Sequence, residues 1–299
     1  MTSGEALQWV TQTLLRARID DARMEAELLL GHVLRMSRAQ LYTEPGRSLS
    51  TAETKDLRRL VRRRRSHEPT AYILGHCGFY GIEFYINHGV FIPRPETELL
   101  VEKAIELARR VYCPGKQMIL ADIGTGCGAI AVSLALALPR ARIHATDISA
   151  SALLLAERNC RRHAVDGQIE LLSGNLLEPL LHPVDMIVAN LPYIRNSEFE
   201  DLTSEIADFE PTVALAGGED GLDGIRQMLE QVPGKLNDGA CLLLEIGLGQ
   251  GDAVTSLMDS YFPQADIELI PDLGGIDRVV QVVRQSSITG RQPSIHTRE

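Results

Sequence analysis

The stretch Asn190-Leu191-Pro192-Tyr193 combines residue types that can hold and orient a planar amino group. The Asn190 side-chain oxygen can accept one hydrogen of such a group, and a backbone carbonyl of the turn can accept the other. The Tyr193 ring can pack against the flat group that carries the amine. This arrangement leaves a nitrogen lone pair facing an electrophile, although the same residues also occur in ordinary strand-to-turn junctions.

The residues before this stretch predict its place in the fold. Val184–Ala189 is a short, apolar and β-branched run, which is typical of a buried parallel strand. Pro192 prevents further ladder pairing, so we expect the strand to end near Asn190. In open α/β sheets, reactive groups collect just beyond the carboxyl ends of the strands.

A second candidate site is the loop Gly124-Thr125-Gly126-Cys127-Gly128, between a predicted strand at Met118–Ile123 and a predicted helix at Ala129–Leu138. Its glycines let the backbone turn tightly and approach a ligand closely. The spacing matches neither the dinucleotide motif nor a P-loop. Gly-x-Gly-x-Gly just after Asp122 instead resembles motif I of class I S-adenosyl-L-methionine (AdoMet) methyltransferases, where the loop faces the amino-acid end and the ribose of the ligand.

Two polar positions follow the next predicted strands. Asp147 ends the second strand, Arg142–Thr146, and its carboxylate can accept from both ribose hydroxyls. Asn175 and Leu176 follow the third strand, Gln168–Leu172, where Asn175 is placed to meet an adenine edge. The order of loop, acid, amide and Asn-Leu-Pro-Tyr predicts an AdoMet site rather than a Rossmann-like fold without this ligand.

The elements that must position these residues alternate along the chain. Helical periodicity at Ala150–Arg162, Gly221–Val232 and Ala253–Tyr261 separates apolar strands. Further strands are expected at Ala240–Ile246, Ile267–Ile270 and Arg278–Val283. Strands separated by helices predict a parallel, doubly wound sheet. We therefore expect an α/β fold, a Rossmann-like seven-stranded sheet in residues 93–285, and a disordered tail at 286–299.

The first part of the chain has a different pattern. Residues 5–66 show helical periodicity, and Ser50 with Glu53 has the spacing of a capping box. We expect a small all-helical domain at residues 1–75 and a β-hairpin linker at 76–92, where glycines separate aromatic and β-branched residues. The run Arg62–Arg65 is either a contact for phosphate or an acidic partner, or a solvated helix end, which we favour.

Composition narrows the class of protein. The 299 residues carry a formal net charge of −10, which argues against a dedicated nucleic-acid binder. Residues 1–80 hold 13 Lys and Arg against 9 Asp and Glu, whereas residues 81–299 hold 17 against 31. The five scattered cysteines suggest neither a disulfide framework nor a zinc site. With no signal segment and no long apolar run, we expect a soluble, cytoplasmic protein without membrane contact.

With these residues in place, the chain from about residue 20 to 284 resembles the HemK/PrmC family of protein-(glutamine-N5) methyltransferases. The segments that carry the resemblance, besides the two sites above, are Asp21–Leu30, Glu68–Gly75, Ile92–Glu98, Phe209–Pro211, Leu215–Leu222, Leu244–Gly247 and Asp272–Val279. The helical domain followed by a hairpin also matches that family. Two positions depart from its usual pattern: Leu191 stands where the family has proline, and Asn175 stands where it has Asp.

The resemblance implies methyl transfer from AdoMet to the side-chain nitrogen of the glutamine in the Gly-Gly-Gln loop of class I peptide-chain release factors, with S-adenosyl-L-homocysteine as the other product. Asn190, Leu191, Pro192 and Tyr193 would bind the substrate and carry the catalysis, and Asn190 would also border the cofactor. The implied protein is a monomer that needs no metal and binds no nucleic acid directly. Because the Leu191 carbonyl survives the loss of proline, the acceptor chemistry should survive too.

Two rival functions remain open at the level of sequence. An adenine-N6 methyltransferase also acts on an amino group attached to an sp² carbon, and Asn-Leu-Pro-Tyr resembles the motif of rRNA adenine dimethylases. Such an enzyme must capture a base and bind phosphates, and the acidic catalytic half argues against this. An AdoMet-binding protein without turnover is disfavoured by the intact Asn190–Tyr193 stretch. Methylation of a glutamine in another protein, such as a ribosomal protein, is a further alternative.

Overall fold

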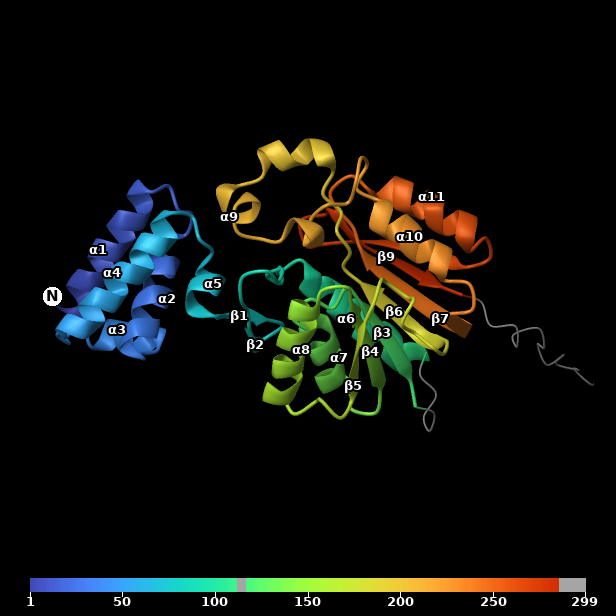
Figure 1. Ribbon diagram of the computed structural model, residues 1–299, viewed down its shortest axis with the longest axis horizontal. Helices are drawn as coiled ribbons and strands as arrows, with labels where there is room; N and C mark the ends of the chain where they lie inside the picture. Colours follow the sequence, from blue (N-terminus) through green and yellow to red (C-terminus); the bar gives the residue numbers. More distant parts are fainter. Residues whose placement is uncertain (112–116, 285–299) are drawn as a thin grey trace, which may run out of the picture. The chain divides into compact units, whose positions relative to one another are not determined.

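The computed structural model describes residues 1–111 and 117–284 (Figure 1). They form two compact units. The first contains Met1–Cys77 together with Ile86–His88 and Leu202–Glu210, and the second contains the other described residues, from Gly78–Tyr85 and Gly89 to Asp201 and from Pro211 to residue 284. The predicted tail at 286–299 lies outside the described residues.

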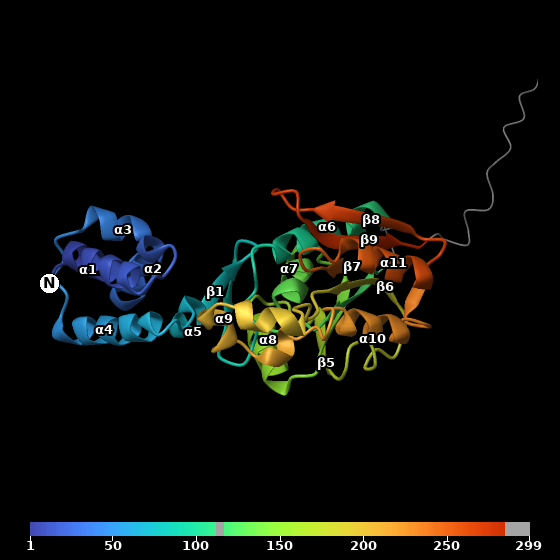
Figure 2. The same ribbon diagram turned by 90° about the horizontal axis from the view of Figure 1, so that it is seen from above.

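The first unit is helical, as the periodicity predicts (Figure 2). Its elements are α1 (Ser3–Arg16), α2 (Ala22–Leu34), α3 (Arg38–Thr43), α4 (Thr51–Arg65), α5 (Thr70–Leu74) and the short α9 (Ser204–Ala207). The apolar faces of α1, α2 and α4 meet in one core, in which Leu14, Leu29 and Leu57 are fully buried. Helices α1, α3 and α4 each begin with a capping box, and the predicted box at Ser50 and Glu53 is confirmed.

The arginine run at the end of α4 is only partly a solvated helix end. Arg62 and Arg65 are exposed, as that interpretation expects. Arg63, however, donates to both carboxylate oxygens of Glu68, which lies just beyond the helix. Arg64 is 2% exposed and lies within ion-pair distance of Glu25 and Glu205. Half of the run therefore stabilises the helical unit internally.

The predicted hairpin is present directly after α5. Strands β1 (His76–Phe79) and β2 (Ile82–Tyr85) pair in a two-stranded sheet. The two residues between them, Tyr80 and Gly81, both have positive φ angles, which is the geometry of the tight turns that suit hairpins.

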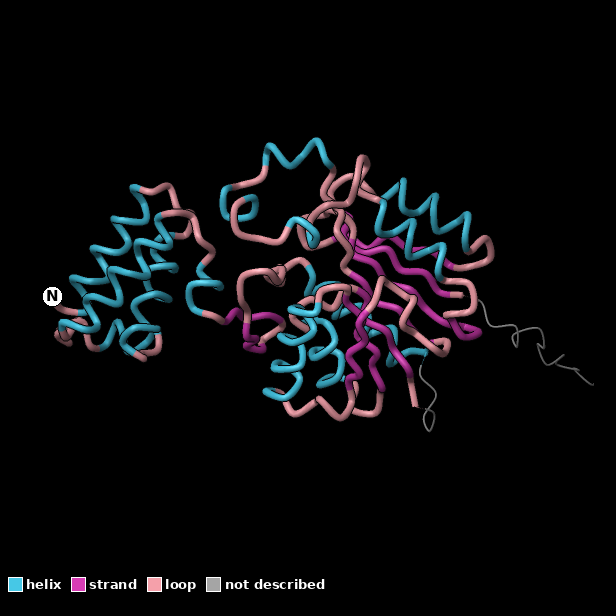
Figure 3. The backbone as a smooth tube through the Cα atoms, in the orientation of Figure 1, coloured by secondary structure: helices cyan, strands magenta, loops and turns pink. Residues whose placement is uncertain are grey.

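The second unit is built on a seven-stranded sheet (Figure 3). Its strands are β3 (Ile119–Ile123), β4 (Arg142–Asp147), β5 (Ile169–Ser173), β6 (Val184–Ala189), β7 (Leu236–Glu245), β8 (Asp266–Pro271) and β9 (Asp277–Val283), in the order β5-β4-β3-β6-β7-β9-β8. The first five are parallel, but β9 runs antiparallel to both β7 and β8. The prediction of an entirely parallel sheet is therefore wrong at this edge, because β8 and β9 are joined by a tight turn rather than by a crossover helix.

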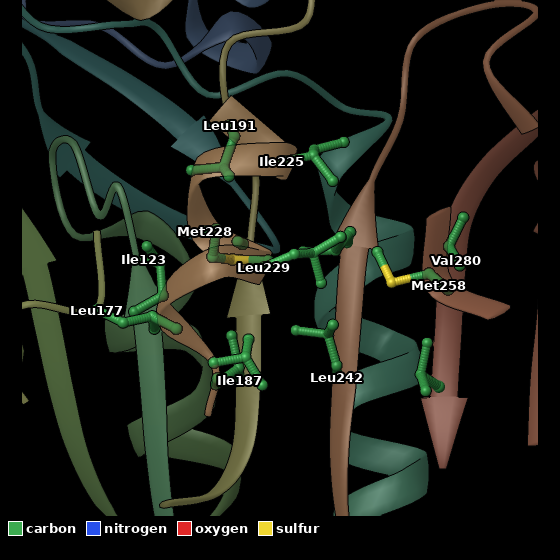
Figure 4. Close-up of a cluster of buried hydrophobic side chains, with 14 of the residues drawn as sticks. Ile123, Leu177, Ile187, Leu191, Ile225, Met228, Leu229, Leu242, Met258 and Val280 are labelled. Atoms are coloured by element: carbon green, nitrogen blue, oxygen red, sulfur yellow. The ribbon is translucent and has the colours of Figure 1, made fainter. Parts of the chain in front are cut away.

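Helices cover both faces of this sheet. They are α6 (Thr97–Val111), α7 (Ala129–Ala137), α8 (Ala150–Arg162), α10 (Asp223–Gln231) and α11 (Gly251–Tyr261), with 3-10 turns η1 (Asn196–Asp201) and η2 (Thr212–Ala214). Figure 4 shows Ile225, Met228 and Leu229 of α10 packed against strand residues such as Ile187 and Leu242. Met258 of α11 extends the same core, and α6 packs against β6, β7 and β9.

Candidate active site

The stretch Asn190–Tyr193 begins directly after β6, in the middle of the sheet and at its carboxyl edge. Neighbouring β3 ends at Ile123, which pairs in register with Ala189, so the glycine loop and the Asn190–Tyr193 stretch start side by side. A Cβ on Gly124 would lie 3.5 Å from the Leu191 Cδ2 atom. The structure therefore brings the two predicted sites next to each other.

Backbone bonds and glycine geometry fix the shape of the glycine loop. Gly124, Gly126 and Gly128 all have positive φ angles, a region that side chains disfavour. The N–H groups of Gly124 and Thr125 both donate to the Thr146 carbonyl at 2.9 Å, which ties the loop to the end of β4. A Cβ on Gly126 would meet no atom closer than 4.0 Å, so the loop is open to a ligand at that position.

Two of the predicted cofactor-binding side chains turn into the protein. Thr125 is buried, and its hydroxyl donates to the Asp122 carboxylate at 2.6 Å. Cys127 is also buried, and its carbonyl accepts from the Asn159 side chain at 2.8 Å. These residues can face a ligand only through their backbone.

Asp122 holds the glycine loop in place through hydrogen bonds. Its Oδ2 atom accepts from the Thr125 hydroxyl and from the Ala131 N–H at 3.1 Å, whereas its Oδ1 atom has no hydrogen-bond partner in residues 1–111 and 117–284. Complete burial raises the pKa of this carboxyl to about 7, and the nearby Asp147 adds to the rise.

Asp147 stands where a ribose-binding acid is predicted. Its Oδ2 accepts from the Gly126 N–H at 2.9 Å, and its Oδ1 accepts from the Ser149 N–H at 2.8 Å. Burial raises the pKa of this carboxyl, while hydrogen bonds from the backbone N–H groups of Ser149, Gly126 and Ile148 oppose the rise. Each carboxylate oxygen keeps lone-pair capacity for a ligand hydroxyl.

The end of β5 joins the same edge. The Gly174 N–H donates to the Asp147 carbonyl at 3.1 Å, which places Asn175 next to the acid. Asn175 is partly exposed, so its side chain is accessible. Leu176 has a φ angle of +51° and packs against the core cluster beneath α10. The loop, Asp147 and Asn175 thus lie together, as the sequence predicts.

The side chains of Asn190 and Tyr193 are held by residues from distant segments. The Asn190 Nδ2 atom donates to the hydroxyl of Thr97, at the start of α6, at 3.0 Å. The Tyr193 hydroxyl donates to Glu245 Oε1, at the end of β7, at 3.3 Å. The site therefore contains two hydrogen-bonded pairs, Asn190 with Thr97 and Tyr193 with Glu245.

A second set of contacts holds the backbone of Tyr193. Its carbonyl accepts from the buried Gln250 side chain at 3.1 Å, and the Gln250 Oε1 atom accepts in turn from the Gly247 N–H. A Cβ on Gly217 would lie 2.8 Å from the Tyr193 carbonyl carbon, and one on Gly221 would lie 2.3 Å from its oxygen. These glycines are needed because the chain passes too close for any side chain.

Leu191 is 5% exposed and belongs to the core cluster, as Figure 4 shows. Its side chain lies between the glycine loop and α10, where a Cβ on Gly224 would be 3.5 Å from the Leu191 Cβ. The side chain therefore packs inward, which is consistent with a role for this residue through its backbone.

Comparison with known proteins identifies the class of this site. Family models match residues 5–75 as the PrmC N-terminal domain and residues 88–211 as the methyltransferase small domain. A release factor glutamine methyltransferase from Geobacter sulfurreducens is 39% identical over 93% of this chain and 95% of its own length. One from Koribacter versatilis is 38% identical over 98% of this chain and 100% of its own length. The chain belongs to the release factor glutamine methyltransferase family.

A solved structure shares the fold of this chain. A solved methyltransferase from Pyrococcus furiosus, 16% identical, aligns with a TM-score of 0.50 over 70% of this chain and 91% of its own length. This likeness shows the class I methyltransferase fold alone. The methyltransferase domain implies a methyl donor of the AdoMet type, and the open glycine loop with its carboxylate fits such a ligand.

The structure shows what several segments of the family resemblance contact, although the sequence pattern assigned them no role. Thr97 comes from the Ile92–Glu98 motif, Glu245 and Gly247 come from Leu244–Gly247, and Gly217 and Gly221 come from Leu215–Leu222. All of them support Asn190 or Tyr193. Each of these residues lies in a segment that carries the family resemblance, and this was the signal in the sequence that they matter. Their spacing along the chain could not show which residues they contact.

Two other kinds of site are absent from the described ranges. No helix within residues 1–111 or 117–284 is long and apolar enough to cross a membrane. The same part of the chain holds no group of three or more His, Cys, Asp or Glu residues that could bind a metal ion.

Proposed function

We propose that this protein transfers a methyl group from AdoMet to the N5 side-chain nitrogen of the glutamine in the Gly-Gly-Gln loop of class I release factors, leaving S-adenosyl-L-homocysteine. The observation that carries the chemistry is that the Asn190–Tyr193 stretch starts beside the Gly124 loop, which would set an amino-group-binding stretch next to a cofactor loop. The substrate class follows from relatives that span nearly the whole chain. The same proposal implies a cytoplasmic enzyme acting in translation termination.

The cofactor would lie along the carboxyl edge of β3, β4 and β5. The backbone of Gly124–Gly128 would face its amino-acid end, and Asp147 would accept from the ribose hydroxyls. Asn175 and Leu176 would border the adenine, and Asn190 would border the methyl group. When bound, AdoMet supplies an electrophilic methyl group carried on a sulfonium.

The residues after β6 would bind and orient the glutamine amide that receives the methyl group. An amide nitrogen is a poor nucleophile because its lone pair is delocalised into the carbonyl. Asn190 Oδ1 and the Leu191 carbonyl would accept hydrogen bonds from its two N–H groups, which aims the remaining lobe and stabilises positive charge developing on nitrogen. As the N–C bond forms and the C–S bond of the donor breaks, one N–H proton would leave to water. Pro192 would keep this turn rigid, and Tyr193 would pack on the amide plane. Such orientation is worth as much as roughly 7–11 kcal/mol of the barrier.

The charge distribution favours a protein substrate over a polyanion. The segment 81–299 holds 17 Lys and Arg against 31 Asp and Glu, so it would repel nucleic acid phosphates, while the basic residues 1–75 supply a second recognition surface. We propose a monomeric enzyme, with residues 1–75 recognising the body of the release factor. The adenine-N6 alternative has no such support in this chain.

The decisive experiment offers labelled AdoMet and the enzyme to a release factor, to rRNA and to duplex DNA in separate reactions. A release factor whose loop glutamine is replaced by alanine is the matched control. We expect label only in the unaltered release factor. Label in a nucleic acid and none in the protein would refute the proposed substrate, and equal labelling of the control would refute the proposed acceptor atom.

A further inference from the structure

Asn159 is a buried amide that the proposed transfer step does not use. It lies on α8 and is 0% exposed. Its Oδ1 atom accepts from the Tyr85 N–H at 2.8 Å. Its Nδ2 atom donates to the Tyr85 carbonyl at 3.0 Å and to the Cys127 carbonyl at 2.8 Å. One side chain therefore binds both the end of β2 and the middle of the glycine loop.

These three bonds allow the Asn159 amide only one orientation. An Asn amide has two hydrogens to donate, and each of them has a carbonyl acceptor here. If Oδ1 and Nδ2 exchanged places, an oxygen would face both carbonyls, and the Tyr85 N–H would face another donor. Asn159 also bonds the Tyr85 backbone as a residue of a neighbouring strand would, through one donor and one acceptor. Asn159 thus holds Tyr85 and Cys127 at the same time and in a fixed direction.

The bond to Cys127 fixes one peptide group of the glycine loop. In a trans peptide, the carbonyl and the following N–H point in opposite directions. Asn159 holds the Cys127 carbonyl, and the Gly128 N–H donates to the Thr125 carbonyl at 2.8 Å. Glycines with positive φ angles, Gly126 and Gly128, stand on both sides of Cys127. Because glycine backbone adopts many conformations, the loop depends on such bonds for its shape.

Further contacts dock β2 on α8. The guanidinium carbons of Arg162 and Arg158 lie 4.3 and 4.9 Å from the centre of the Tyr85 ring. The His163 Nε2 atom lies 2.9 Å from the Glu83 carbonyl oxygen, within hydrogen-bond distance. Tyr85 is 37% exposed, so its ring can be removed without opening the core. The docking of β2 can therefore be weakened without any change to the glycine loop itself.

We propose that Asn159 is a positioning residue that holds the glycine loop in its cofactor-binding shape and couples that shape to the docking of β2 on α8. When β2 leaves α8, Asn159 loses both of its bonds to Tyr85, and its bond to Cys127 loses its fixed direction. A cofactor that favours the ordered loop must favour docked β2 by the same factor. This inference rests on the proposed cofactor site and does not depend on which acceptor is methylated.

The first test weakens the docking of β2. Tyr85→Ala removes the ring beside Arg158 and Arg162, and we expect the Kd for AdoMet to rise about two- to fivefold, the equivalent of one exposed cation–π contact. The KM for the release factor, measured at saturating AdoMet, should not change. Tyr261→Ala removes a similarly exposed ring from the end of α11 and is the matched control, with the Kd of the wild type. An unchanged Kd in Tyr85→Ala would overturn the coupling.

The second test is a double-mutant cycle with Asn159. Asn159→Ala should raise the Kd for AdoMet about tenfold, because the Cys127 carbonyl loses its donor. In that background Tyr85→Ala should have no further effect on the Kd, since the connection to the loop is gone. Equal effects of Tyr85→Ala in both backgrounds would refute the assigned role of Asn159. The comparison of Tyr85→Ala with Tyr261→Ala stands by itself if Asn159→Ala does not fold.

A third measurement uses the wild-type protein and hydrogen exchange. The Tyr85 N–H, which donates to Asn159, should exchange with solvent about tenfold more slowly when S-adenosyl-L-homocysteine is bound. The Tyr80 N–H is the matched control in the same hairpin, because it donates to Glu98 at 2.8 Å, and its exchange should not change. Equal protection of both amides would show general stabilisation by the ligand and would contradict the specific coupling.

These outcomes can be separated from those for the proposed methyl transfer. If S-adenosyl-L-homocysteine protects the Tyr85 N–H and Tyr85→Ala weakens AdoMet binding while no release factor is methylated, the coupling stands and the proposed acceptor fails. If a release factor is methylated but the Tyr85 N–H is not protected and Tyr85→Ala binds AdoMet as the wild type does, the proposed function stands and the coupling is wrong.

Discussion

Arg64 and Glu205 form an ion pair inside the helical unit, with 2.5 Å between Nη2 and Oε1, although 141 residues separate them in sequence. Arg64 lies near the end of α4, whereas Glu205 lies on α9, in the segment that follows the Asn190–Tyr193 stretch. Arg64 also pairs with Glu25 of α2 through its Nε atom at 3.2 Å. One buried guanidinium thus joins three segments, and it incorporates residues 202–210 into the helical unit.

Arg64→Met tests this assignment. The change leaves Glu25 and Glu205 without their cation, and we expect the free energy of unfolding to fall by about 2–3 kcal/mol, below the full cost of breaking a buried pair because Glu205 is partly exposed. Arg62→Met removes the same kind of side chain from an exposed position two residues earlier and should change stability by less than about 0.5 kcal/mol. Urea unfolding of both variants checks this, and equal losses would contradict it.

A second prediction concerns cofactor affinity. Asp147→Ala removes the carboxylate proposed to bind the ribose, and it also leaves the Gly126 N–H without its acceptor. A hydrogen bond to a charged group is worth about 1.5–3 kcal/mol, so AdoMet should bind roughly ten- to a hundredfold more weakly. Isothermal titration measures this, with Asp252→Ala on the exposed side of α11 as the control. Unchanged affinity in Asp147→Ala would remove the residue from the site.

The departure at Leu191 gives a third prediction. Leu191→Pro keeps the backbone carbonyl, so kcat should remain within a few-fold of wild type. The lost packing of a buried side chain should lower stability by about 1–2 kcal/mol. Asn190→Ala removes an acceptor aimed at the reacting nitrogen and should lower kcat by roughly 10²–10³-fold. If Leu191→Pro loses as much kcat as Asn190→Ala, the backbone role assigned to residue 191 is wrong.

The pH dependence of stability tests the buried acid beneath the glycine loop. The pKa of Asp122 is raised from 3.8 to about 7 on folding, so between these values the folded state binds more protons than the unfolded state. The free energy of unfolding should therefore decrease as the pH rises from about 4 to 7, and level off above that. Asp122→Asn should reduce the difference between pH 5 and pH 7 measured in urea. Burial raises the pKa of Glu245 too, so Glu245 contributes with the same sign and part of the slope should remain.

The sequence predicted the local elements well because their signals are local. The helix at Ala150–Arg162 and the strand at Val184–Ala189 have the predicted bounds, since periodicity and flanking turn residues lie within each segment. The direction of a strand relative to its neighbours in the sheet has no such signal within the strand itself. The apolar pattern of β9 is the same whether it runs parallel or antiparallel to β7, and only the short β8–β9 connection decides.

The candidate site likewise contains residues whose place could be predicted from their order along the chain and residues whose place could not. Asp147 and the glycine loop could be placed from their order along the chain, because parallel strands end at one edge of the sheet. Thr97 and Glu245 could not, because they lie 93 and 52 residues from their partners Asn190 and Tyr193. Arg64 was misjudged for a similar reason: a run of arginines at a helix end does not show which of them will meet an acid far away in sequence.

The last prediction separates recognition by the helical unit from chemistry at the sheet. Arg62 and Arg65 are the members of the arginine run that remain exposed, and neither lies near the Asn190–Tyr193 stretch in sequence. If residues 1–75 recognise the body of the release factor, the double change Arg62→Glu and Arg65→Glu should raise the KM for an intact release factor several-fold and leave kcat and AdoMet affinity unchanged. Added salt should reduce the difference between variant and wild type.

A short Gly-Gly-Gln peptide serves as the matched substrate for this comparison. It lacks the remote contacts that position the glutamine, so the wild type should methylate it poorly, and the double variant should methylate it equally poorly. An unchanged KM for the intact release factor would assign Arg62 and Arg65 to a solvated helix end. A peptide methylated as efficiently as the intact protein would show that recognition resides in the loop alone, and that the helical unit has another role.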